Sequence, residues 1–76
     1  MELNEFLNNI KGKILIAGIG NPLRGDDAVG SYIVKRLSKK KINAILVDCE
    51  EQFERFIEKI IQDQPDTIIF IDALHM

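Results

Sequence analysis

Three carboxylates are the residues of this chain whose types and spacing could support chemistry. Asp26 and Asp27 are adjacent and follow a glycine-containing turn, and Asp72 follows an apolar run much later in the sequence. Carboxylates that lie close together can share a proton or hold a divalent cation, and such a cation can polarise a carbonyl group or activate water. The first question is therefore whether the fold brings these residues together.

The segment Lys13–Gly30 predicts a buried strand, a tight turn and the start of a helix. Residues 14–17 are all apolar and do not alternate, which is typical of a central parallel strand covered on both faces. The glycines that follow permit close approaches that a side chain would block. Asp26 and Asp27 then stand at the start of a helix, where negative charge is favoured, and we assign Asp26 to that capping role.

This turn has the outline of three known loops and departs from each. Leu23 stands where the dinucleotide fingerprint G-x-G-x-x-G needs glycine. Gly20 and Gly25 have the spacing of a P-loop, but two aspartates follow in place of Gly-Lys-Ser/Thr, and Pro22 lacks an N–H donor. Peptidyl-tRNA hydrolases carry a similar G-L-G-N-P-G turn, yet Leu23 again replaces glycine, and that family's tyrosine and histidine are missing. The turn therefore favours a cation or a hydrolytic water over a phosphate.

The hydrophobic pattern predicts alternating helices and strands along the chain. Amphipathic spacing predicts a first helix over residues 3–10, a second over 27–40 and a third over 52–62. Further strands are predicted over 42–48 and from Thr67 to Asp72. The core stripe of the second helix is predicted to be Val29, Ile33 and Leu37, and the third helix is predicted to have a broad apolar face: Phe53, Phe56, Ile57, Ile60 and Ile61.

This order predicts a single α/β domain over residues 1–76, with an open parallel sheet, helices on both faces and right-handed crossovers. If the two crossovers run in opposite directions, the strand order is 2-1-3, and a crevice opens beyond the carboxyl ends of strands 1 and 3. Asp27, in the loop after strand 1, and Asp72, at the end of strand 3, then converge in that crevice. With order 1-2-3 they would not.

Two converging carboxylates are compatible with several chemistries. No serine, threonine or cysteine is paired with a histidine in a recognisable motif, so nucleophilic catalysis is disfavoured. The two residues could share a proton as in an aspartic protease, but the Asp-Thr/Ser-Gly signature is missing. A metal site fits better, because rigid strand ends can hold oxygen ligands around a divalent ion.

Two segments resemble motifs of the hydrogenase maturation endopeptidases, which trim the large subunit of [NiFe] hydrogenases. The long stretch G-I-G-N-P-L-R-G-D-D-A-V-G (Gly18–Gly30) is similar to that family's N-terminal signature, with Ala28 where many relatives have glycine. The short stretch I-I-F-I-D-A (Ile68–Ala73) resembles its second motif, a strand that ends in Asp-Ala. The resemblance implies a phosphorylase/hydrolase-like α/β fold and a cytoplasmic protease.

The resemblance also implies a ligand set and a substrate. Family members bind metal through an acidic residue that matches Asp27, an aspartate that matches Asp72, and a histidine far downstream. The metal is the nickel carried by the immature large subunit, so the protease recognises loaded nickel and then removes the C-terminal extension. Asp27 and Asp72 are accordingly the predicted catalytic and metal-binding residues. The one histidine of this chain, His75, is expected to be a loop residue near the crevice.

The chain ends soon after the second motif, and we expect it to represent about the N-terminal half of a longer domain. Strand 3 would then be an exposed apolar edge, which allows self-association and which folded proteins usually cover. By itself such a fragment is expected to be inactive as a protease. The alternatives are a hydrolase like the peptidyl-tRNA hydrolases, or a truncated module that only binds a partner.

Composition sets further limits. The chain has 76 residues, of which 46% are hydrophobic and 29% charged, as in an ordinary soluble globular domain with a modest core. A net charge of −2 disfavours a nucleic-acid partner. One cysteine excludes an internal disulfide and fits a reducing cytoplasm. We identify neither a signal peptide nor a membrane span.

Two remaining residues near the predicted crevice have simpler interpretations. Asp48 ends strand 2, but in the order 2-1-3 it lies beyond strand 1, so a solvated or substrate-contacting role is expected rather than ligation. Cys49 is expected to be a part-buried apolar residue.

Overall fold

The computed structural model describes residues 2–21, 23 and 28–72. The helices and strands alternate along the chain as the sequence predicts. In order they are α1 (Leu3–Asn8), β1 (Ile14–Ile19), α2 (Val29–Leu37), β2 (Ile45–Glu50), the short 3₁₀ helix η2 (Phe53–Phe56), α3 (Ile57–Asp63) and β3 (Thr67–Ile71).

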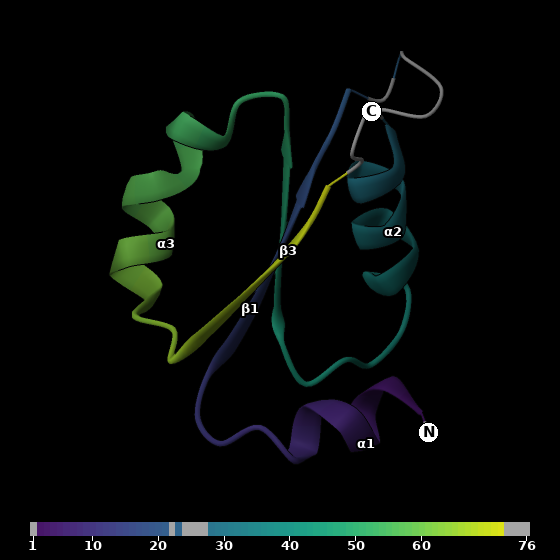
Figure 1. Ribbon diagram of the computed structural model, residues 1–76, viewed down its shortest axis with the longest axis vertical. Coiled ribbons are helices and arrows are strands. Elements are labelled where there is room, and N and C mark those ends of the chain that lie inside the picture. The colour runs from purple at the N-terminus through teal and green to yellow at the C-terminus, as the bar shows by residue number, and fades with distance from the viewer. Residues whose placement is uncertain (1, 22, 24–27, 73–76) are drawn as a thin grey trace.

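The three strands form a parallel sheet in the order β2-β1-β3, which confirms the prediction. Strand β1 is central and its residues 14–18 are buried, as its unbroken apolar run predicts. Figure 1 shows α3 on one side of the sheet and α2 on the other, with α1 lying below α2. The sheet is therefore covered on both faces by helices.

Each face of the sheet has its own apolar cluster. On the α3 side, Leu15 and Ala17 of β1 pack with Ile60 of α3. On the other side, Ile14 and Ile16 of β1 pack with residues of α1 and α2. Alternate side chains of one strand thus enter two different cores, which is why β1 must be apolar at every position.

Helix α2 is shorter than predicted, and its buried stripe differs. The expected range 27–40 contracts to Val29–Leu37, and the buried residues are Gly30, Ser31 and Val34 in place of Val29 and Ile33. Val29 is 38% exposed. Gly30 and Ser31 occupy the buried side of the first turn because the helix lies so close to the strands there that a Cβ atom at Gly30 would meet the backbone of Ile19 and Ile71.

Strand β2 and the segment after it are also shifted from their predicted positions. Strand β2 covers Ile45–Glu50, not residues 42–48. The backbone N–H of Asn43 donates to Oδ1 of Asn4 in α1 at 3.0 Å, so this residue is held by a helix and not by the strand ladder. The predicted helix over 52–62 begins with the 3₁₀ helix η2, in which Phe53 and Phe56 both pack on the α3-side core.

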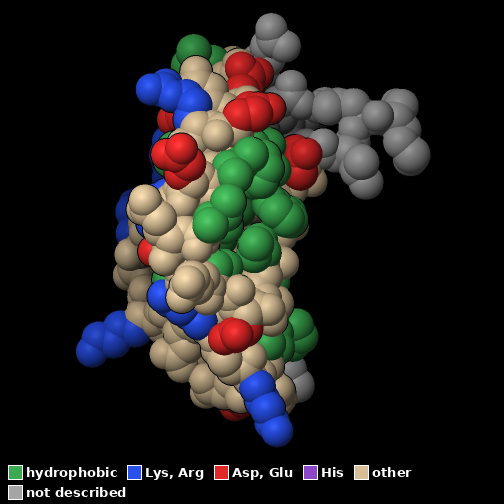
Figure 2. All heavy atoms as spheres, turned by 90° about the vertical axis from the view of Figure 1, so that its left-hand side faces the viewer, with side chains coloured by type: hydrophobic (Ala, Val, Ile, Leu, Met, Phe, Trp, Pro, Cys, Tyr) green, Lys and Arg blue, Asp and Glu red, His purple; other side chains and the backbone are tan. Residues whose placement is uncertain are grey.

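Strand β3 is an open edge of the sheet, as predicted, since within the described residues it pairs with β1 and with no other strand. Its residues on the α3 side remain accessible, with Phe70 51% and Ile68 39% exposed. Ile57 and Ile61 of α3, which belong to the predicted broad apolar face of that helix, are exposed as well. Figure 2 looks onto the α3 side and shows hydrophobic side chains gathered into a patch there.

In the part of the chain that the structure describes, no helix combines the length and the apolar character needed to cross a bilayer.

Candidate metal centre

The carboxyl end of the sheet is where the predicted site residues should meet. Gly18 of β1 is flanked in the sheet by Asp48 of β2 and Ile71 of β3, so the three strands are in register at this level. Asp72 follows Ile71 directly and is exposed; β3 ends at Ile71, one residue before the predicted strand end at Asp72. Its carboxylate is therefore accessible to a metal ion at this end of the sheet.

The other predicted ligand, Asp27, lies outside the described residues, as do Asp26 and His75. The structure does place the residues that follow Asp27 in the sequence. Helix α2 begins at Val29, and a Cβ atom added at Gly30 would lie 2.3 Å from the carbonyl oxygens of both Ile19 and Ile71. The first turn of α2 therefore touches the ends of β1 and β3, immediately beside Asp72.

A second glycine makes this close approach possible. A Cβ atom at Gly18 would lie 2.3 Å from the carbonyl oxygen of Gly30 and 2.5 Å from Cγ2 of Val34. Such distances are far below van der Waals contact, so both backbones need glycine where they cross. The close approach that the glycines of this segment predict is confirmed for this pair.

Asp48, at the carboxyl end of β2, is bound to α2. Its Oδ2 accepts a hydrogen bond of 3.0 Å from the hydroxyl of Ser31, and its Oδ1 accepts one of 3.3 Å from the backbone N–H of Glu50. The ammonium of Lys35, one turn further along α2, lies 3.9 Å from Oδ2. Ser31 is 1% exposed, whereas the side chain of Asp48 keeps 23% of its surface. Sequence reasoning placed Asp48 at a strand end but missed this contact.

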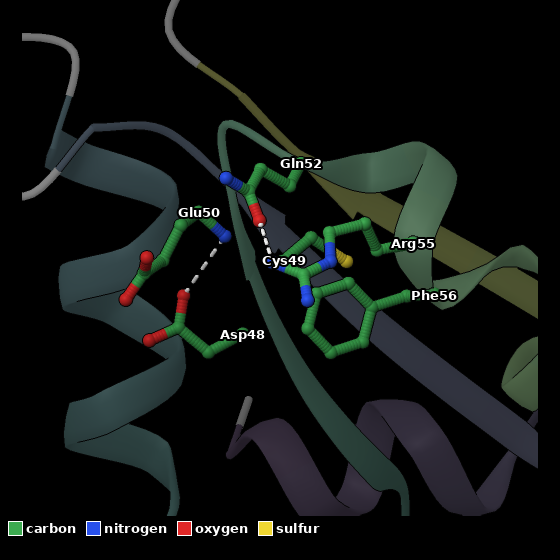
Figure 3. Close-up of a pocket in the computed structure, with 6 residues that line it drawn as sticks. All are labelled: Asp48, Cys49, Glu50, Gln52, Arg55 and Phe56. Carbon is green, nitrogen blue, oxygen red and sulfur yellow. Dashed lines mark hydrogen bonds between the residues drawn. The ribbon is translucent and has the colours of Figure 1, made fainter.

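An open cavity of about 420 Å³ also lies at the carboxyl end of β2. Its lining residues are drawn in Figure 3 and come from the end of β2, from the turn that follows and from η2: Asp48, Cys49, Glu50, Gln52, Arg55 and Phe56. The guanidinium of Arg55 donates a hydrogen bond of 2.6 Å to Oε1 of Gln52. Because β1 separates β2 from β3, this cavity lies on the other side of β1 from Asp72.

Cys49 is fully buried, more completely than the sequence predicts, and it belongs to the α3-side core. Burial raises the pKa of its thiol, and the negative charge of Asp48 raises it further. A thiol held protonated is a poor nucleophile and a poor metal ligand, so Cys49 has a packing role.

Among the described residues, no three or more histidine, cysteine, aspartate or glutamate side chains are grouped so that they could hold a metal ion. A metal ion at this end of the sheet would therefore need, besides Asp72, ligands that lie outside the described residues. Asp27 is the candidate that the sequence offers.

Two comparisons with known proteins give the same result. A candidate hydrogenase maturation protease of Methanocaldococcus jannaschii is 38% identical over an alignment of 83 positions, which covers 97% of this chain and 48% of that protein. The crystal structure of HycI, a [NiFe] hydrogenase maturation protease from Thermococcus kodakarensis, superposes with a TM-score of 0.76 at 39% identity, over 84% of this chain and 42% of that one. The chain is related to the hydrogenase maturation proteases.

The relationship confirms the resemblance found in the sequence and the fold it implied. The chain spans about half the length of the two relatives, 48% and 42%. No family model matches it. A shared fold at this level of identity means that the β2-β1-β3 sheet and its helices are those of the maturation proteases.

Proposed function

We propose that this protein is an endopeptidase that recognises nickel in the immature large subunit of a [NiFe] hydrogenase and removes that subunit's C-terminal extension. The supporting observation is the contact of Gly30 with Ile71, because it brings the helix that follows Asp27 against the strand end that precedes Asp72. The relatives support a role in hydrogenase maturation.

In this proposal Asp27 and Asp72 bind the nickel ion that the substrate carries. A carboxylate at a strand end is held by the sheet, so it can meet an incoming ion without a large rearrangement. Nickel accepts oxygen ligands, and an ion held beside the scissile bond would polarise its carbonyl group or activate a water molecule. The metal is thus part of the substrate, and a precursor without nickel would not be cleaved.

Two further parts of the proposal concern where and with what the protein works. We expect it to act in the cytoplasm, where its single thiol would stay reduced, with the large-subunit precursor as its partner. Self-association through the open edge of β3, beside the exposed Ile68 and Phe70, is a second expected interaction. Sedimentation of the wild-type protein and of Phe70→Lys over a range of concentrations tests it.

The deciding experiment compares cleavage of a nickel-loaded and a nickel-free large-subunit precursor by the full-length protein. We expect cleavage of the loaded precursor alone, and its loss in both Asp27→Asn and Asp72→Asn. Asp63→Asn is the matched control, since Asp63 ends α3 at the opposite end of the sheet, where it is paired with Lys59 at 2.9 Å. Equal cleavage of the two precursors, or full activity in both site variants, would refute the proposal.

A further inference from the structure

The first turn of α2 is attached to all three strands. Gly30 lies against the backbone of β1 at Ile19 and of β3 at Ile71, and the adjacent Ser31 donates its hydroxyl to Asp48 of β2. The structure therefore fixes the start of this helix across the whole width of the sheet, at the end where the strands finish.

The contacts differ in what they determine. The glycine crossing sets how closely the helix approaches β1 and β3, but a surface without side chains does little to fix the rotation of the helix about its axis. The buried side chain of Val34 helps to fix that rotation one turn later, and in the first turn a directional hydrogen bond does so, because the hydroxyl of Ser31 must face Oδ2 of Asp48. The donor is buried, since Ser31 is 1% exposed, while the acceptor is partly accessible to solvent. Because that acceptor is a carboxylate, the bond is stronger than one between neutral groups.

The acceptor is itself held in place. Oδ1 of Asp48 accepts the backbone N–H of Glu50, and the ammonium of Lys35 lies 3.9 Å from Oδ2. Two different anchors, one at the end of β2 and one in α2, thus orient this carboxylate toward Ser31. The side chain has little freedom left to serve as a ligand elsewhere.

We propose that Ser31 and Asp48 are positioning residues for the metal site: their hydrogen bond sets the orientation of the first turn of α2, and thereby of the chain that enters it from Asp27. This inference rests on the proposed function, in which Asp27 binds nickel. It assigns Asp48 a role that differs from ligation, and it gives Ser31 a role that the sequence did not suggest.

The test measures binding of Ni²⁺ to the full-length protein by isothermal titration, at a temperature where each variant is folded by circular dichroism. We expect Ser31→Ala and Asp48→Ala each to weaken nickel binding by about tenfold, the lower end of what supporting groups around a metal contribute. The double variant should bind nickel as tightly as the weaker-binding of the two single variants, because both changes remove the same hydrogen bond. Ser38→Ala is the matched control. The hydroxyl of Ser38 donates to the backbone carbonyl of Lys35 near the far end of α2. The nickel affinity of this variant should equal that of wild type.

Asp48→Asn separates positioning from a direct charge effect. An asparagine amide can donate to the oxygen of Ser31 while its carbonyl accepts from Glu50, so both hydrogen bonds survive without the charge. We expect Asp48→Asn to bind nickel within about threefold of wild type. As a readout without metal, the amide NMR signals of Gly30 and Ile71 should shift in Ser31→Ala and stay in place in Ser38→Ala.

Wild-type affinity in Ser31→Ala, or equal losses in Asp48→Asn and Asp48→Ala, would overturn the inference. If Ser31→Ala does not fold, the comparison of Asp48→Asn with Asp48→Ala still tests the inference. Failure of the proposed function has a different signature: wild type and Asp27→Asn would then bind nickel equally well.

Discussion

Replacing Gly30 with alanine tests the packing that brings α2 to the ends of the strands. On an exposed face of a helix, this change would stabilise the protein by about 1 kcal/mol, because alanine has the higher helix propensity. Here the new methyl group would lie 2.3 Å from two backbone carbonyl oxygens, those of Ile19 and Ile71. Neither oxygen can move without displacing its strand.

Overpacking in a well-packed region costs roughly 1–3 kcal/mol and occasionally more, and two backbone clashes place Gly30→Ala at the upper end of that range. After subtracting the propensity gain of about 1 kcal/mol, we expect a net destabilisation of about 2 kcal/mol. For a domain of this size that corresponds to a decrease in Tm of roughly 8–16 °C. It is also a large part of a total stability of about 4–11 kcal/mol.

The assay is urea unfolding followed by circular dichroism, with Arg36→Ala on the exposed side of the same helix as the control. We expect the control to change the free energy of unfolding by no more than about 0.5 kcal/mol. A Gly30→Ala protein as stable as wild type, or more stable, would show that α2 does not lie against β1 and β3 as described. The reasoning from the glycine crossing to the metal site would then fail too.

Three further predictions concern the core and the ends of the sheet. Ile60→Ala should lower the free energy of unfolding, measured in urea, by about 2–4 kcal/mol because this side chain is 6% exposed. Ile61→Ala, at a position that is 65% exposed, should lower it by less than about 1 kcal/mol. Equal losses would contradict the assigned orientation of α3. Asp66→Ala removes the acceptor of a 2.7 Å hydrogen bond from the Lys13 N–H and should cost about 1 kcal/mol in the same assay, and no change would show that water replaces the bond. Because the pKa of Cys49 is raised in the folded state, the stability that this thiol contributes is complete below its unfolded pKa of about 8.5 and decreases as the pH rises through the folded value. The urea midpoint of wild type should therefore fall more between about pH 7 and pH 10 than that of Cys49→Ala, and parallel decreases would refute this account.

The fold was predictable because each level of the sequence agrees with the others. An apolar run such as Ile14–Ala17 has few stable places other than the centre of a parallel sheet, and two crossovers of fixed hand leave few strand orders. The order 2-1-3 was then chosen because it brings two motif carboxylates to neighbouring strands. The structure confirms the order, and the placement of Asp72 beside the start of α2 agrees with that reasoning.

The errors have one physical origin, which is that hydrophobicity does not report distance between elements. Val29 was expected inside and Ser31 was not considered, because a stripe of large apolar residues is the usual sign of a buried helix face. A helix that crosses a strand at a glycine pair needs small residues there, and a buried serine is acceptable when a carboxylate accepts its hydrogen bond. Likewise, Ile42 and Ala44 are apolar because they pack against the core on the α1 and α2 side of the sheet, outside the strand ladder.

Among the described residues nothing pairs with the outer side of β3, and this open side determines how the sheet can grow. Its free backbone groups offer a template for one more strand, and the exposed Ile68 and Phe70 would give that strand and its helix an apolar surface to cover. An added strand that ran parallel to β3 would end at the same level of the sheet, and the loop that follows it would start next to Asp72. The edge of the molecule that is costliest to leave bare is therefore also the one from which another ligand could be added to the proposed metal site.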